Sequence, residues 1–222
     1  MTTDVTPDQE PLPLRRAQTA LTEERIVAAA TELFLASGYI DTTLEAVAKA
    51  ARVGSRTVYV RFGTKAQLFK RVVDVAIVGD SAPVEVLGRD WMQRALTAPT
   101  AAERIAAAAS ANRQIMERTW ALFAVAQQAA TIEPAIQEAF QEGRRGARRG
   151  QQVFWTAMAA DGMLPEGADL DWLVDTTSLL GSAETYLQVG YLYDWSFDQY
   201  EQWLATTWTR LAAASAGPVA RL

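Results

Sequence analysis

Two residue types that carry much of protein chemistry are missing from this chain of 222 residues, which has neither cysteine nor histidine. Without cysteine there is no disulfide framework and no thiol chemistry. Without histidine there is no Ser-His-Asp or Cys-His nucleophile, no imidazole base and no histidine-ligated metal. An enzyme built from this sequence would depend on carboxylates, Lys, Tyr and Ser. We therefore expect neither a catalytic site nor a metal or other cofactor.

Long apolar segments are missing as well. The longest uncharged run, Thr119 to Ile132, has 14 residues, which is too short to span a bilayer. Residues 1–16 are polar, contain proline and lack an apolar signal segment. No strand-like alternation, repeat or low-complexity tract is present. These observations predict an all-α, cytoplasmic protein with no membrane partner.

Charge is distributed unevenly along the chain. The formal net charge is −5, yet residues 15–71 hold ten Lys and Arg against five Asp and Glu, and the remainder holds eleven against 21. Contacts to a polyanion are local, so the local balance matters more than the total. A basic module on an acidic body is typical of a protein that offers one end to nucleic acid.

Two short helices joined by a tight turn are predicted between residues 42 and 62. Thr42, with Glu45 three residues later, has the spacing of a capping box at a helix start. Apolar residues then recur at helical spacing until the pattern breaks at Arg52-Val53-Gly54. A second helix is expected over Ser55–Phe62, with Val58 facing inward and polar side chains facing outward. This is the arrangement that a DNA-reading helix-turn-helix requires.

These residues resemble the DNA-binding domain of TetR-type transcriptional repressors. The resemblance covers roughly residues 22–72, and it departs from the usual pattern at Arg52, where the family has Gly, at Gly54, where it has Ser or Thr, and at Arg61, where it often has His. So many positions at fixed spacing make a specific signal. The matching positions are Gly38, Tyr39, Thr42, Thr43, Val47, Ala48, Ala51, Val53, residues 57–65 and Leu68.

The expected DNA contacts fall into two groups. Ser55, Arg56 and Val60 lie on the outward face of the second helix and are expected to face base edges in the major groove. The resemblance implies that a second group holds phosphates, which sets register rather than sequence preference. This group consists of Thr43, Thr57, Tyr59, Arg61 and Lys65.

Three regions are expected: a disordered arm over residues 1–20, a helix-turn-helix domain over 21–79, and a larger helical domain over 80–222. The resemblance implies that this larger domain binds a ligand and forms the dimer. Arg15 and Arg16 in the arm either contact phosphates or belong to a solvated tail. A linking helix over 65–78 joins the two domains. Further helices are expected from Thr22 to Gly38 and over residues 84–95, 101–130, 134–161, 169–192 and 197–214.

Aromatic residues at helical spacing in the two long helices of the body are either core or the wall of a cavity, since amide side chains lie in the same apolar stretch. If a cavity exists, it binds a small apolar or aromatic ligand, and the expected lining is Trp120, Phe123, Gln127, Trp155, Met158 and Tyr186. The resemblance implies a homodimer through the last two helices. The expected interface residues are Leu173, Leu180, Leu187, Trp203, Leu204 and Leu211.

Two charged clusters are explained by helix structure rather than by a functional site. The arginines between Arg144 and Arg149 are expected to form a solvated helix face, paired with Glu138 and Glu142. The acidic residues between Asp169 and Asp175 fit a helix N-terminus better than a metal site.

Two functions remain. The first is a dimeric, sequence-specific transcriptional repressor that binds a near-palindromic double-stranded operator and is released by the small ligand. The alternative is an all-helical apolar-ligand carrier or enzyme whose N-terminal helices are structural. Salt-dependent binding to DNA discriminates between them.

Overall fold

The computed structural model describes residues 14–80 and 86–216, and within them the chain forms ten α-helices and one short 3₁₀-helix. No strand occurs in these two ranges, in agreement with the predicted all-α class. The α-helices are α1 (Leu14–Asp41), α2 (Leu44–Ala50), α3 (Ser55–Phe62), α4 (Lys65–Val78), α5 (Asp90–Thr97), α6 (Ala101–Ala129), α7 (Pro134–Ala160), α8 (Leu170–Leu180), α9 (Ala183–Tyr193) and α10 (Phe197–Ala214). The 3₁₀-helix η1 spans Val86–Gly88.

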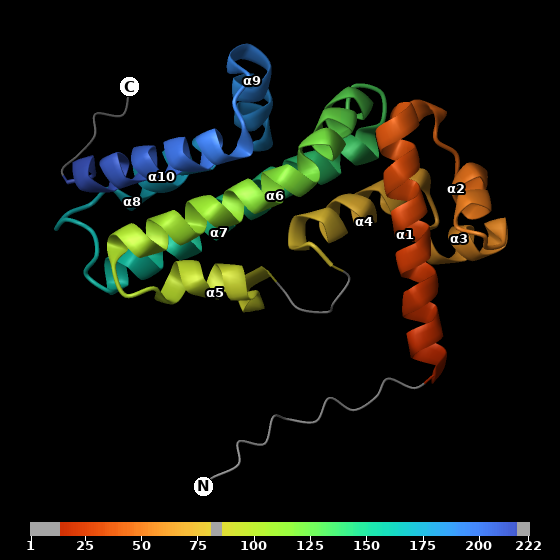
Figure 1. Cartoon of the computed structure of the whole chain (residues 1–222), viewed down its shortest axis with the longest axis horizontal. Helices are drawn as coiled ribbons and strands as arrows, with labels where there is room; N and C mark the ends of the chain where they lie inside the picture. Colours follow the sequence, from red (N-terminus) through yellow and green to blue (C-terminus); the bar gives the residue numbers. More distant parts are fainter. Residues whose placement is uncertain (1–13, 81–85, 217–222) are drawn as a thin grey trace, which may run out of the picture.

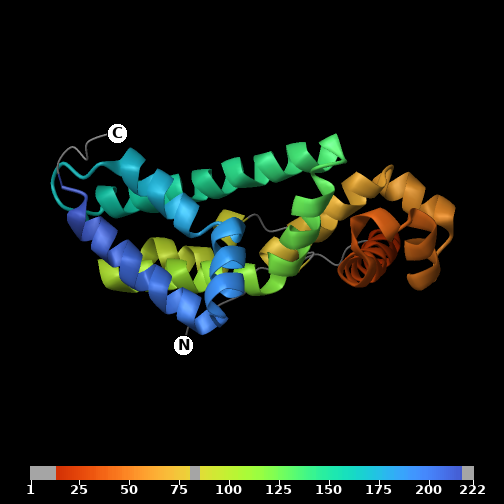
Figure 2. The ribbon, with the colours of Figure 1, turned by 90° about the horizontal axis from the view of Figure 1, so that it is seen from above.

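The molecule has an N-terminal head at one end and a body at the other (Figure 1). The head consists of α1 to α4, and the body of α5 to α10. The long helices α6 and α7 run from the far end of the body to a turn beside the head, as the view from above also shows (Figure 2). Helix α10 packs along α6, and α8 packs along α7. Helix α9 projects away from α10.

Two apolar cores hold these parts together. The head core contains Ile26, Phe34, Val47, Val58 and Leu68, all without exposed surface, and it extends into the ends of α6 and α7. The body core contains the large side chains of α7, α8 and α10. Because the head core includes side chains of the two long helices, the head does not pack independently of the body.

The first helix begins earlier than the sequence indicated. Residues 14–20, assigned to the arm, are helical, because the run after Pro13 contains good helix formers and no further proline. Thr22, expected to start the helix, instead donates its hydroxyl to the Gln18 carbonyl within it. Residues 1–13 of the predicted arm, and the side chains of Arg15 and Arg16, lie outside the described residues.

The helix predicted over 169–192 is broken in two. Gly181 follows the end of α8, and the Ser182 hydroxyl accepts a hydrogen bond from the Thr185 amide at the start of α9. Ser is a strong N-cap residue, so this cap stabilises a new helix start rather than continuation of the old one. The two halves therefore point in different directions (Figure 1).

Candidate nucleic-acid interface

Hydrogen bonds fix the start of α2, and a cation from α1 holds the turn between α2 and α3. Thr43, not Thr42, caps α2 by accepting a hydrogen bond from the Ala46 amide, and Thr42 instead donates to the Gly38 carbonyl at the end of α1. Arg52 adopts the left-handed conformation with φ 53°. The Arg25 guanidinium donates to the Ala51 carbonyl at 2.5 Å and so holds this turn against α1. Sequence reasoning had not assigned Arg25 a role.

Helix α3 has one buried and one exposed face, as its sequence predicted. Val58 and Phe62 are buried in the head core. The opposite face carries Ser55, Arg56 and Val60, all exposed, and Val60 is 75 % exposed. A short helix that presents an exposed polar and small-apolar face is able to enter the major groove of DNA.

Tyr59 and Glu45 form a hydrogen bond across this surface. The Tyr59 hydroxyl on α3 donates to Glu45 Oε1 on α2 at 2.5 Å, and both residues are exposed. This hydrogen bond is the main reason why the pKa of the Glu45 carboxyl is lowered and that of the Tyr59 hydroxyl is raised. The surface therefore carries one carboxylate beside a predicted phosphate contact.

Two further predicted phosphate contacts, Lys65 and Arg61, have partners on α1. Lys65 Nζ donates to the Tyr39 carbonyl at 2.7 Å and the Ile40 carbonyl at 3.1 Å, and lies 4.3 Å from the centre of the Tyr39 ring. Arg61 lies 3.9 Å from the Glu23 carboxylate. Lys65 thus ties the start of α4 to the end of α1, a framework role that the sequence did not reveal. Thr57 is half-buried, and Thr43 is exposed.

The head is joined to the body by two polar contacts in addition to the shared core. Arg118 on α6 donates to the Ala76 and Ile77 carbonyls at the end of α4, at 2.9 and 2.8 Å. Tyr39 donates its hydroxyl to Glu133 in the α6–α7 turn at 3.4 Å. Cations near the last carbonyls of a helix are favourable because those carbonyls lack intrahelical partners. Arg118 therefore fastens the linking helix to the body.

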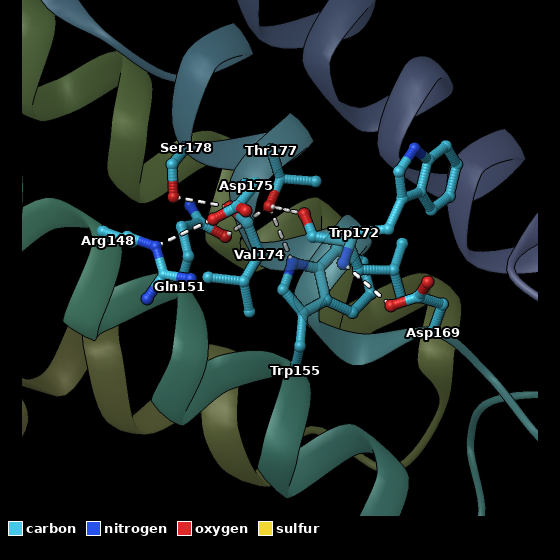
Figure 3. A network of polar contacts seen from close by, with 10 residues as sticks. Arg148, Gln151, Trp155, Asp169, Trp172, Val174, Asp175, Thr177 and Ser178 are labelled. Carbon is cyan, nitrogen blue, oxygen red and sulfur yellow. Dashed lines mark hydrogen bonds and ion pairs between the residues drawn. The ribbon is translucent and has the colours of Figure 1, made fainter. Parts of the chain in front are cut away.

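The residues predicted to line a ligand cavity do not gather in one place. Trp155 and Met158 are fully buried in the body core. Figure 3 shows that Trp155 Nε1 donates to the Thr177 hydroxyl at 2.8 Å, so Trp155 has its hydrogen-bond partner within the core. Tyr186 is also buried, and it stacks on Phe197.

The other three predicted lining residues lie elsewhere on the two long helices. Trp120 is 42 % exposed and Gln127 is exposed. Phe123 is half-buried and meets Phe140 edge-on. Trp120 and Gln127 therefore cannot share a lining with Trp155, because helical spacing turns them outward. Two surface hollows, one between α1 and α2 and one in the loop after α7, contain none of the six residues.

The arginine run on α7 is a solvated face, with longer-range pairing than predicted. Glu142 pairs with Arg145 and Arg149, as expected for residues on one helix. Arg148 pairs instead with Asp175 on α8 at 2.8 Å, and Arg144 pairs with Glu184 on α9. Figure 3 shows the Arg148 pair and the Asp169 cap of α8, which accepts from the Trp172 amide. The acidic cluster is thus a helix start with an ion pair.

The predicted dimer residues differ in their exposure. Leu173 and Leu204 are fully buried in their own chain's core and cannot form an interface. The remaining four are half-buried, namely Leu180, Leu187, Trp203 and Leu211. The structure also exposes apolar side chains beyond these six, of which the sequence had indicated only Leu179 as apolar surface of the last helices. These are Leu179, Tyr191, Leu192 and Tyr193, which are 70 %, 90 %, 64 % and 65 % exposed.

Comparison with known proteins agrees with this geometry. Residues 26–72, which include α2, α3 and most of α4, match the family model described as bacterial regulatory proteins of the tetR family. No curated protein sequence matches the chain. No helix in the described parts of the chain is long and apolar enough to cross a membrane.

Several solved structures share the fold. One is a TetR-family transcriptional regulator from Rhodococcus sp., with TM-score 0.68 and 12 % identity over 86 % of this chain and 98 % of that one. Another, from Mesorhizobium loti, has TM-score 0.65 and 17 % identity over 87 % and 96 % of the two chains. NalD of Pseudomonas aeruginosa, the secondary repressor of the MexAB-OprM multidrug efflux pump, has TM-score 0.60 and 19 % identity over 89 % and 98 %.

The exposed face of α3, the fixed turn before it and the matched family model together define a helix-turn-helix DNA-binding protein that regulates transcription. Its N-terminal part matches the DNA-binding domain of the TetR family, and its whole fold is that of solved TetR-family regulators. This class of protein binds DNA and is not a class of enzymes, which favours a DNA-binding regulator over the carrier or enzyme alternative.

Proposed function

We propose that the protein is a sequence-specific transcriptional repressor that acts in the cytoplasm on a near-palindromic operator. The exposed face of α3 is the observation that carries this proposal, with Ser55, Arg56 and Val60 facing the bases. Arg56 is suited to a guanine edge and Val60 to a thymine methyl group. The repressor role is supported by NalD, which shares the fold and is a repressor.

The phosphate contacts in this proposal are Thr43, Thr57, Tyr59, Arg61 and Lys65. An ammonium group has three N–H donors, and Lys65 uses two of them on carbonyls, so one remains for a phosphate. When Tyr59 binds a phosphate, its hydroxyl exchanges the hydrogen bond to Glu45 for one to the phosphate.

An operator-binding experiment with Arg56→Ala tests the base-reading assignment. Truncation should weaken operator binding by about 1–3 kcal/mol and relax the preference at one base pair in each half-site. Arg94→Ala, which removes an exposed arginine from α5 in the body, is the matched control. If Arg56→Ala discriminates among all single-base operator variants as the wild type does, Arg56 does not read bases.

A homodimer through the last helices of the body is part of the proposal. One recognition helix reads few bases, and a two-fold dimer doubles the site. Large apolar side chains exposed on a monomer mark interaction surfaces when they gather. The proposed interface consists of Leu179 and Leu180 on α8, Leu187, Tyr191 and Leu192 on α9, and Trp203 and Leu211 on α10.

We further propose that a small apolar or aromatic molecule binds in the body and lowers operator affinity. The aromatic body core supplies apolar walls. Movement of α6 would reach the head through the Arg118 contact with the end of α4, and a coupling of about 1–3 kcal/mol is sufficient for release. By reciprocity, operator DNA must weaken ligand binding by the same factor. A ligand that binds equally well with and without operator is not the effector.

A further inference from the structure

The junction between α8 and α9 is packed against two other helices of the body. Asn112 on α6 donates its amide Nδ2 to the Gly181 carbonyl at 2.9 Å. Trp208 on α10 is fully buried. A Cβ atom at Gly181 would lie 2.8 Å from Asn112 Nδ2 and 3.3 Å from Trp208 Cζ2. Both side chains therefore border Gly181, where a larger residue would force a neighbouring side chain to move.

Each of these two side chains has a buried polar atom without a partner among the described residues. These atoms are Asn112 Oδ1, an acceptor, and Trp208 Nε1, a donor. The donation from Nδ2 to a carbonyl fixes the orientation of the Asn112 amide, so its oxygen is the unpaired atom. Buried polar groups in native proteins are almost always hydrogen-bonded. Both atoms belong to side chains that border Gly181, and an unpaired acceptor and an unpaired donor there indicate a group that the chain does not itself supply.

The other polar groups near this junction are already bonded within the chain. The Tyr200 hydroxyl donates to the Leu180 carbonyl at 3.0 Å, and the Gly181 amide donates to the Thr177 carbonyl at 2.9 Å. Arg113, which follows Asn112 on α6, pairs with Glu117, Asp198 and Glu201. Among the described residues, the junction therefore has one unpaired hydrogen-bond acceptor and one unpaired donor, and its charged neighbour Arg113 is paired.

We propose that this junction, defined by Asn112, Gly181 and Trp208, binds the hydroxyl group of a neutral apolar molecule such as an alkylphenol or an alcohol. This inference rests on the proposed ligand response and names its chemical class. A hydroxyl donates to Asn112 Oδ1 and accepts from Trp208 Nε1 with a single oxygen. A carboxylate has no proton to donate, an ammonium has no lone pair to accept, and a methyl ether accepts only. The junction thus selects hydroxyl compounds from their acids and ethers.

Helix α6 connects the junction to the head. Asn112 and Arg118 lie on the same helix, α6, and Arg118 bonds the last carbonyls of α4. Because Gly181 is closely packed by Asn112 and Trp208, a molecule larger than water separates α10 from the α8–α9 junction when it enters. The binding energy of the hydroxyl group is therefore coupled to the packing of α6, and through Arg118 to the angle of α4.

The first test uses the full-length wild type and needs no substitution. Binding of 4-propylphenol, 4-propylanisole and 4-propylbenzoate is measured by isothermal titration calorimetry at neutral pH. The phenol should bind about tenfold more tightly than the ether or the acid, the scale expected when one buried hydrogen-bonding group is left unpaired. Equal binding of phenol and ether, or no binding of the phenol, overturns the proposal.

The second test locates the site with two variants that place an apolar side chain at each position. Asn112→Leu removes Oδ1 together with the Nδ2 donor to Gly181, and Trp208→Phe removes the indole N–H. Each should reduce phenol affinity by about tenfold and leave ether affinity nearly unchanged. Trp120→Phe, at an exposed tryptophan on α6, is the matched control and should bind the phenol as the wild type does. Wild-type phenol affinity in both junction variants would overturn the assignment.

Operator release is measured separately, so that the two proposals can fail independently. Phenol binding that depends on Asn112 and Trp208 but leaves operator affinity unchanged supports the site and contradicts the ligand response. Operator release by the phenol that persists in both junction variants supports the ligand response and contradicts this site.

Discussion

At the scale of single residues, a few side chains make the polar contacts between head and body that accompany the shared apolar core. Tyr39 is 6 % exposed, packs edge-on against Phe69 and donates its hydroxyl to Glu133. Burial, followed by the charge and hydrogen bond of Glu133, raises the pKa of the Tyr39 hydroxyl to about 12. The folded protein therefore favours the neutral phenol more strongly than the unfolded chain does.

The sign of the resulting pH dependence follows from linkage. The ordinary pKa of tyrosine is 10.0, so the contribution of the Tyr39 proton to stability is complete below pH 10 and is lost as the pH rises to about 12. Phenylalanine cannot ionise. We expect the stability advantage of wild type over Tyr39→Phe to shrink over this range, by at most about 2–3 kcal/mol. Urea unfolding at about pH 9 and about pH 11 measures it.

Tyr191→Phe is the control for this measurement, because it removes a hydroxyl from a side chain that is 90 % exposed. A Tyr39→Phe variant whose free energy of unfolding stays parallel to that of the wild type from about pH 9 to about pH 11 would show that Tyr39 is not the alkaline-sensitive group.

At the scale of elements, the linking helix α4 is stabilised at both ends. Thr64 and Gln67 form a reciprocal capping box at its start, and Arg118 bonds two of its last carbonyls. Gly79 follows the helix in the left-handed conformation, with φ 92°, and packs against the Arg118 guanidinium. The helix that would transmit movement is therefore anchored by one side chain of the body.

Replacement of Arg118 should loosen this anchor. Arg118→Met removes both hydrogen bonds and should lower the free energy of unfolding by about 1 kcal/mol, since the side chain is partly solvated. It should also weaken operator binding and reduce the effect of ligand on that binding, because α4 is no longer held to α6. Thermal unfolding and operator titration, with Arg94→Met as control, measure both effects. Unchanged coupling between ligand and operator in Arg118→Met would mean that the movement takes another route.

Local signals determined how much of each element the sequence could predict. Helices α3, α4 and α10 have the predicted bounds, because caps, glycines and apolar periodicity agree there. The break after Gly181 has a local signal in the Ser182 cap, which the prediction overlooked, whereas the packing of Gly181 involves residues of α6 and α10 that are distant in the sequence. The partners of Lys65 were missed because its acceptor carbonyls, on Tyr39 and Ile40, are distant in the sequence. Periodicity shows which face is buried and leaves open what the face contacts.

At the scale of the whole molecule, the head lies at one end, α8 and α10 lie toward the other end, and α9 projects from near the middle (Figure 1). Helices α8, α9 and α10 carry the exposed apolar side chains, whereas α3 lies at the far side of the head. In a two-fold dimer, half-sites one DNA turn apart must be matched by the separation of the two heads. Helices α6 and α7 run from the far end of the body to the head. A small change in their angle within the body would therefore alter the separation of the two heads in the proposed dimer.

Disruption of the dimer should abolish high-affinity operator binding without unfolding the subunit. Leu179 is 70 % exposed, so Leu179→Glu places a charge in the proposed interface and leaves the core of the chain intact. We expect a monomer by light scattering and strongly weakened operator binding. Leu21→Glu, at a leucine on α1 that is 60 % exposed, is the control for oligomeric state. A dimeric Leu179→Glu, or a monomeric wild type at micromolar concentration, would place the interface elsewhere or remove it.

The hydrogen bonds that hold the helices of the head in place have an evolutionary consequence. Arg25, Lys65 and Arg118 all donate to backbone carbonyls rather than to side chains. Every amino acid has a carbonyl, so these three bonds survive mutation of the residues that accept them. None of these acceptors lies on α3, so Ser55, Arg56 and Val60 on its exposed face are not part of this framework and can diverge as operators diverge. A regulator built in this way can acquire a new target gene by substitutions on one helix face while its architecture is inherited unchanged.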